Sequence, residues 1–110
     1  MTDIKIYRKD NFIVGFECKN HSGFAKYGKD IVCAGISCIT QTAILGIQNI
    51  ANANCNVTID ENLGYLKLEI VEKDKNLQTF KETQIILRTM LCGLEDLQRQ
   101  YPKYMKLEDK

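Results

Sequence analysis

The longest uncharged stretch of this chain runs from Ile31 to Ile59 and constrains the fold more than any other feature. Asp30 stands directly before it and is a good helix N-cap. The stretch is long enough to span a membrane, but ten Ser, Thr, Asn and Gln side chains interrupt it, which favours a buried central helix. Apolar residues recur there at spacings of three and four and form one stripe, which consists of Val32, Ile36, Ile39, Ala43, Ile47 and Ile50.

The rest of the chain reads as two hairpins, a second helix and a short last strand. The two hairpins are predicted from alternating or β-rich runs on either side of turn signals, with strands at 3–8 and 12–18 and near 56–60 and 64–72. The second helix is predicted at 77–100, between the cap Asn76 and the helix breaker Pro102. Residues 104–109 form the candidate last strand.

The order ββαββα(β) predicts an α+β fold with two layers, in which an antiparallel sheet of two hairpins packs against two main helices. A chain of 110 residues is expected to form a single domain over 1–110. The first helix carries apolar or small side chains outside its stripe. The second helix adds Ile85, Ile86 and Met90 beside its main stripe, and we expect helical surface of this kind to form a homodimer.

Charge and cysteine content narrow the functional class. The 15 basic and 14 acidic residues give a net charge of +1 and are interspersed, so we expect neither direct nucleic-acid binding nor membrane attachment. No apolar signal segment opens the sequence, and we expect a cytoplasmic location. Five cysteines are an odd number, which argues against a disulfide framework.

One of these cysteines is placed for reactivity. With Asp30 as N-cap, Cys33 occupies the third helical position, where the helix dipole and free N–H groups favour a thiolate. His21 is the only histidine of the chain and lies before a loop that can fold back over this helix start. A Cys–His pair is the apparatus of thiol nucleophilic catalysis, and the N–H of Cys33 itself is a candidate donor to the oxyanion. Taken singly, each residue is also compatible with a structural role.

A metal site is the competing interpretation of the same segment. Cys18, His21, Cys33 and Cys38 have a spacing that superficially resembles a zinc site. Cys33 and Cys38, however, are five residues apart on one helix, which separates them by about 140° around its axis. We therefore expect neither a metal nor a cofactor.

The segment HSGFAKYGKDIVCAGIS at 21–37 resembles the signature of the ribosomal-processing cysteine protease family, Prp. That signature is roughly G-H-x(5-6)-G-x-D-I-V-C-A-[AG]-x-S, and the matching residues are His21, Gly28, Asp30, Ile31, Val32, Cys33, Ala34, Gly35 and Ser37. The resemblance extends to both hairpins, the uncharged helix and the late stretch QIILRTMLCGLEDL. Asn20 departs from the pattern, since the family usually has Gly before the His.

The resemblance implies a cysteine endopeptidase that removes the N-terminal extension of large-subunit ribosomal protein twenty-seven, after a hydrophobic segment that ends in an aromatic residue. It implies Cys33 as nucleophile and His21 as base. Asp30 is then a supporting residue that caps the helix or orients His21, and Ser37 lies one turn after Cys33 on the same helix face. The alternative is a non-catalytic ribosome-associated binding or regulatory domain of the same fold.

The loop between His21 and Asp30 is a candidate substrate loop. Its two glycines allow conformations that are closed to other residues, and we expect the loop to move aside for an extended peptide. Its aromatic side chains are candidates for contact with apolar substrate residues. The predicted substrate-loop residues are Gly23, Phe24, Tyr27 and Gly28.

Overall fold

The computed structural model of this chain describes residues 1–21, 23–26, 30–71 and 76–109. Its elements follow the predicted order and confirm the α+β class. They are β1 (Thr2–Lys9), β2 (Phe12–Lys19), α1 (Ile31–Asn49), β3 (Cys55–Asp60), β4 (Tyr65–Ile70), α2 (Leu77–Gln100) and β5 (Met105–Asp109).

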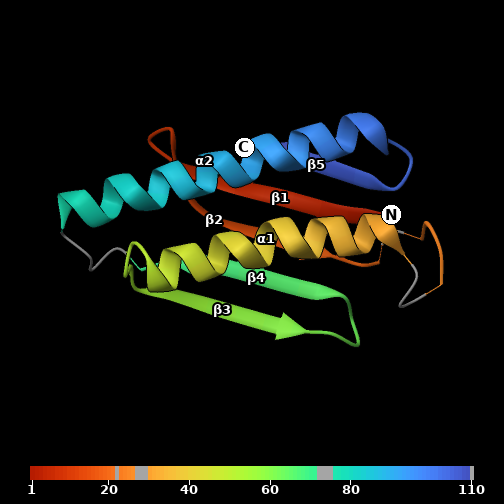
Figure 1. Cartoon of the computed structure of the whole chain (residues 1–110), viewed down its shortest axis with the longest axis horizontal. Helices are drawn as coiled ribbons and strands as arrows, with labels where there is room; N and C mark the ends of the chain where they lie inside the picture. The colour runs from red at the N-terminus through yellow and green to blue at the C-terminus, as the bar shows by residue number, and fades with distance from the viewer. Residues whose placement is uncertain (22, 27–29, 72–75, 110) are drawn as a thin grey trace.

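A five-stranded sheet forms one layer and the two helices form the other (Figure 1). The strand order is β3-β4-β2-β1-β5. The β1–β2, β2–β4 and β3–β4 pairs are antiparallel, as expected of two adjoining hairpins. β5 pairs with β1 in parallel, so that the sheet is mixed. Both helices cover the same face of the sheet, and no helix among the described residues covers the other face (Figure 1).

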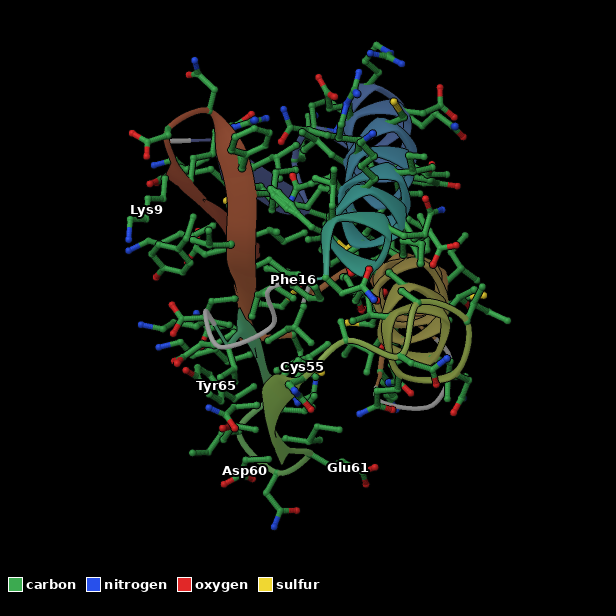
Figure 2. All side chains as sticks on the ribbon, turned by 90° about the vertical axis from the view of Figure 1, so that its left-hand side faces the viewer. Lys9, Phe16, Cys55, Asp60, Glu61 and Tyr65 are labelled. Carbon is green, nitrogen blue, oxygen red and sulfur yellow. The ribbon has the colours of Figure 1, made fainter. Side chains whose placement is uncertain are left out.

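The core lies between the sheet and the helices. Phe16 of β2 is fully buried and points toward the helices (Figure 2). Most of the predicted stripe of α1 is buried there too, which confirms a central core helix even though α1 also has the length and hydropathy of a membrane span. Ile50 is an exception at 71% exposed, because α1 ends at Asn49 and Ile50 is its C-cap residue.

Both predicted helix caps are present. The Asp30 side chain accepts hydrogen bonds from the backbone N–H groups of Val32 and Cys33. The Asn76 side chain accepts from those of Gln78 and Thr79. Each cap satisfies N–H groups that have no partner within the helix, a contribution of about 1 kcal/mol to stability.

Glycines bring the two helices close together where they cross. A Cβ at Gly46 would lie 3.4 Å from Ile86, and one at Gly93 would lie 3.5 Å from Ile39. Ile86 is therefore used inside the monomer, and Met90 is buried at 3% exposure. Ile85, Ile86 and Met90 of α2 were expected to contribute to a dimer surface. Of these three, only Ile85 is largely exposed, at 62%.

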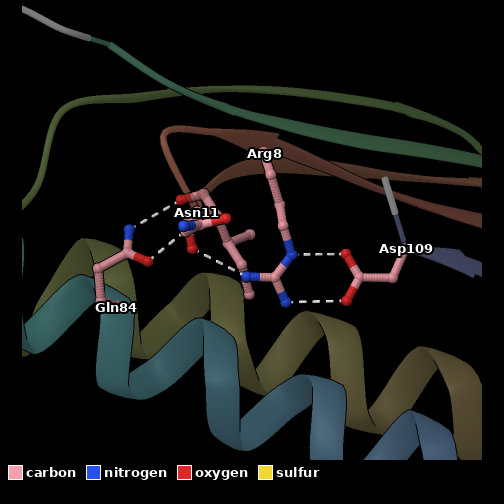
Figure 3. Close-up of polar contacts among 5 residues, drawn as sticks. Arg8, Asn11, Gln84 and Asp109 are labelled. Atoms are coloured by element: carbon pink, nitrogen blue, oxygen red, sulfur yellow. Dashed lines mark hydrogen bonds and ion pairs between the residues drawn. The ribbon is translucent and has the colours of Figure 1, made fainter.

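Polar contacts hold the periphery of the fold (Figure 3). Arg8 of β1 makes a bidentate ion pair with Asp109 of β5, with nitrogen–oxygen distances of 2.6 and 2.8 Å. The Gln84 side chain of α2 bonds both the N–H and the carbonyl oxygen of Ile13. These contacts tie the edge strand and the second helix to the centre of the sheet.

Candidate active site

A cleft of about 480 Å³ opens where β2 ends, α1 begins and β3 turns into β4. The segments that form it are far apart in the sequence and meet at one end of the sheet (Figure 1). Four predicted site residues line this cleft together, namely His21, Asp30, Cys33 and Ser37. The volume is typical of a site that holds a small ligand or a few side chains of a peptide.

Cys33 lies in the first turn of α1 and is half-buried. Its backbone N–H donates to Oδ1 of Asp30 at 2.9 Å, and the N–H of Val32 donates to the same oxygen at 3.0 Å. The N–H of Ala34 donates to the carbonyl oxygen of Asp30. The Cys33 N–H is thus engaged in the helix cap, and its role as a donor to an oxyanion stays a prediction.

Asp30 links the candidate substrate loop to the helix. Its carboxylate is 7% exposed. While Oδ1 caps α1, Oδ2 accepts from the backbone N–H groups of Phe24 and Ala25 at 3.1 and 3.4 Å. The capping role is confirmed, whereas the role in orienting His21 stays a prediction.

His21 follows β2 and lies against the turn between β3 and β4. A Cβ built on Gly64 of that turn would lie 3.1 Å from Cε1 and Nε2 of the imidazole. Asn20, the residue before His21, has a φ of 71°. Glycine adopts this left-handed conformation freely and asparagine tolerates it better than most residues. Asparagine can thus adopt the left-handed conformation at a position where the resembled signature usually has glycine.

The predicted substrate loop is only partly described. Gly23 has a φ of 77°, as expected for a loop glycine. The Phe24 ring packs edge-on against Tyr101 and Tyr104, with ring centroids 5.7 and 5.1 Å apart. Tyr27 and Gly28 lie outside the described residues, so the proposed contact of this loop with substrate stays a prediction.

A polar cluster on the helix-free face of the sheet was missed by the sequence reasoning. Tyr65 lies on this side (Figure 2) and donates its hydroxyl to Glu17 at 2.6 Å. Tyr7 donates to the same carboxylate at 3.3 Å, and Lys19 is 3.5 Å away. Burial raises the pKa of Glu17, but the Tyr65 hydrogen bond, the Lys19 charge and the Tyr7 hydrogen bond outweigh it, so the pKa lies below its usual value. The only local signal was a carboxylate in an otherwise apolar strand.

The other cysteines differ from Cys33 in their surroundings. Cys18 also lines the cleft, but burial and the neighbouring Glu17 charge raise its pKa to about 12. Burial also raises the pKa of Cys55. Cys38 and Cys92 are exposed on the outer surface of the helices. Within the described residues, no group of three or more His, Cys, Asp and Glu side chains is arranged to hold a metal ion.

Comparison with known proteins gives one consistent family. Residues 1–106 match the family model described as cysteine protease Prp. The chain is 28% identical over 98 residues to the ribosomal processing cysteine protease Prp of Bacillus subtilis, which covers 89% of this chain and 87% of that protein. It is 29% identical over 90 residues to its counterpart in Staphylococcus aureus, covering 82% and 80%.

The similarity extends to solved structures. One is the S. aureus ribosomal processing protease Prp in complex with a covalently linked product peptide. It superimposes with a TM-score of 0.88 at 26% identity and covers 100% of both chains. The same protease in complex with a substrate peptide gives a TM-score of 0.84 at 24% identity, again over 100% of both chains, which supports the fold.

Proposed function

This chain belongs to the Prp family of cysteine proteases, and from that premise we propose that it is an endopeptidase with Cys33 as nucleophile and His21 as general base. The observation that carries the proposal is that the cleft brings the only histidine together with the cysteine of the first turn of α1. The competing thiol in the cleft, Cys18, is held protonated by burial. A thiolate rather than a thiol is the attacking species.

The chemistry runs in two steps. His21 takes the proton of the Cys33 thiol, and the sulfur attacks the carbonyl carbon of the scissile peptide bond. The protonated imidazole then gives that proton to the departing amine, and the carbon–nitrogen bond breaks to leave a thioester. In the second step His21 removes a proton from water, the hydroxide oxygen attacks the thioester, and the sulfur leaves and regains a proton.

We propose the N-terminal extension of large-subunit ribosomal protein twenty-seven as the substrate. Three observations support it. The curated relatives are named ribosomal processing proteases. The similar S. aureus protease was solved with a substrate peptide and with a covalently linked product peptide. The cleft is open and carries both apolar and polar walls, as an extended peptide requires. A cytoplasmic location goes with this substrate, and five cysteines without a disulfide bond suit a reducing compartment.

Incubation with the ribosomal protein tests the enzyme and the substrate together. Purified chain is mixed with that protein carrying its N-terminal segment, and the new N-terminus is determined. We expect one cut after a hydrophobic, aromatic-ending segment. Cys33→Ala and His21→Ala are expected to abolish it, whereas Cys38→Ala, an exposed cysteine of the same helix that does not line the cleft, is the matched control. Unchanged cleavage by Cys33→Ala would refute the assignment.

The alternative function is a non-catalytic ribosome-associated domain of the same fold. It predicts no preferential reactivity at Cys33. Rapid alkylation of Cys33 by iodoacetamide at neutral pH, with loss of that preference in His21→Ala, favours the protease. Two results together favour the alternative. The chain binds the ribosomal protein without cleaving it, and iodoacetamide alkylates Cys33 no faster than Cys38.

We also propose that the chain forms a homodimer through the outer surface of its helices. One row of exposed side chains on each helix is uncharged, and the two rows consist of Cys38, Thr42, Leu45, Ile85, Thr89 and Cys92. Leu45 is 56% exposed and Ile85 is 62% exposed. Light scattering at micromolar concentration is expected to give twice the 12.6 kDa of one chain, and Leu45→Lys with Ile85→Lys is expected to halve it. A wild-type mass near 12.6 kDa would refute the dimer.

A further inference from the structure

We propose that Gly64 is a positioning residue that seats the His21 imidazole at the cleft. The absence of a side chain at Gly64 leaves the space that the imidazole occupies. This inference rests on the proposed role of His21 as the general base. It assigns a function to the turn between β3 and β4, which contributes neither nucleophile nor base.

The space between Gly64 and His21 is too narrow for a side chain at Gly64 to make an ordinary packing contact. A Cβ at Gly64 would lie 3.1 Å from both Cε1 and Nε2 of His21, and 3.2 Å from the carbonyl carbon of Asn20. Carbon atoms at optimal separation are about 3.5–4.0 Å apart. A side chain at Gly64 therefore requires either the imidazole or the backbone before it to move.

Hydrogen bonds hold the backbone on both sides of this contact. We therefore expect a side chain at Gly64 to displace the imidazole and not the backbone. The carbonyl oxygen of Asn20 accepts a hydrogen bond from the Thr2 hydroxyl at 3.0 Å. The N–H of Gly64 donates to the carbonyl oxygen of Glu61 at 3.2 Å and closes the turn. His21 is an exposed side chain after the end of β2, and rotation about its side-chain torsions moves the imidazole without moving the backbone.

A hydrogen bond on the helix-free face keeps the two segments together. The last paired residues of β2 and β4 are Cys18 and Leu66, which lie just before the contact. Tyr65, the next residue of β4 past this pair, donates diagonally to Glu17 of β2 at 2.6 Å across the same two strands. Glu17 is 7% exposed, so water competes little for this bond. The start of β4 is thereby held beside the end of β2, where His21 follows.

Two substitutions at Gly64 distinguish the effect of an added Cβ from the effect of backbone strain in the turn. Gly64 has a φ of 62°, and alanine is strained in this region whereas asparagine tolerates it. Gly64→Ala adds both backbone strain and a Cβ, while Gly64→Asn adds the Cβ with less strain. Leu63→Ala is the control, because Leu63 is a 69% exposed neighbour in the same turn that does not line the cleft.

The test measures cleavage kinetics, thermal unfolding and the imidazole signals of the full chain. The single histidine gives one set of imidazole resonances, a readout that needs no activity. We expect Gly64→Ala and Gly64→Asn each to lower kcat between about tenfold and a hundredfold with KM nearly unchanged, and to shift the imidazole resonances. Gly64→Asn is expected to lower Tm less than Gly64→Ala, and Leu63→Ala is expected to retain kcat.

The outcomes distinguish this inference from the proposed function. Wild-type kcat and unshifted imidazole resonances in Gly64→Asn would overturn the seating role, as would a loss of kcat that only follows the unfolded fraction. Full activity of His21→Ala would refute the general base instead, while the imidazole resonances would still report whether Gly64 positions the ring. If Gly64→Ala does not fold, Gly64→Asn decides.

Discussion

Replacing Asp30 by Asn or Ala separates two tasks that its carboxylate performs at once. Oδ1 caps α1 through the N–H groups of Val32 and Cys33, at 3.0 and 2.9 Å. Oδ2 holds the loop through the N–H groups of Phe24 and Ala25, at 3.1 and 3.4 Å. Asparagine is as good an N-cap as aspartate, but its amide nitrogen is a donor and cannot accept the two loop N–H groups.

The magnitudes follow from these four bonds. Loss of the cap costs about 1 kcal/mol, and loss of a hydrogen bond to a charged group costs about 1.5 kcal/mol or more. The 3.4 Å bond is long and adds little. Asp30→Asn is therefore expected to lower the free energy of unfolding by about 1.5 kcal/mol, and Asp30→Ala by about 2.5 kcal/mol.

Urea unfolding of both variants checks this reasoning. With an m-value of about 1.3 kcal/mol/M, the midpoint is expected to fall by about 1 M for Asp30→Asn and about 2 M for Asp30→Ala. The Asn variant is also expected to expose the loop at residues 24–25 to proteolysis while α1 keeps its amide-exchange protection. Equal midpoints for the two variants, or frayed first-turn amides in Asp30→Asn, would refute the division between cap and loop.

Three further outcomes are expected. Tyr65→Phe removes the principal hydrogen bond to Glu17 and should lower the free energy of unfolding at pH 7. Because the folded-state pKa of Glu17 is depressed, its stabilisation is present above the unfolded-state pKa and lost as pH falls through the folded one. The difference between wild type and variant should thus shrink as the pH falls below the usual pKa of a glutamate. A pH-independent difference would argue against an ionised Glu17 as the acceptor. In peptide mapping after brief iodoacetamide treatment at neutral pH, Cys33 should be labelled and Cys18 should not, since burial raises the pKa of Cys18 to about 12; early labelling at Cys18 contradicts this. Asp109→Ala should cost at most about 1 kcal/mol in thermal or urea unfolding because its ion pair is partly exposed, and a larger loss would show that β5 depends on it.

The sequence by itself determined the features that depend on neighbouring residues. Asp30 and Asn76 were identified as caps because a side chain can reach N–H groups only two or three residues ahead. The hairpins and both helices followed from apolar periodicity, which is a local property. The candidate pair of Cys33 and His21 came from position and from the resemblance of one short segment. Ile50 was misassigned because a repeating pattern does not mark the last turn of a helix.

Tertiary structure alone decided how distant segments meet. Nothing in the spacing of β5 shows that it pairs with β1 in parallel. Nor does the sequence place Gly64 against His21, or join Tyr65 to Glu17 across 48 positions. These contacts depend on the register between strands, and register is set by burial of whole faces of the sheet. Ile86 of α2 packs against Gly46 of α1 inside the monomer. The width of the apolar face of α2 therefore overestimated the surface that remains for a second subunit. Residue type and local spacing determine which groups are available for chemistry, whereas the folded sheet determines which of them share the cleft.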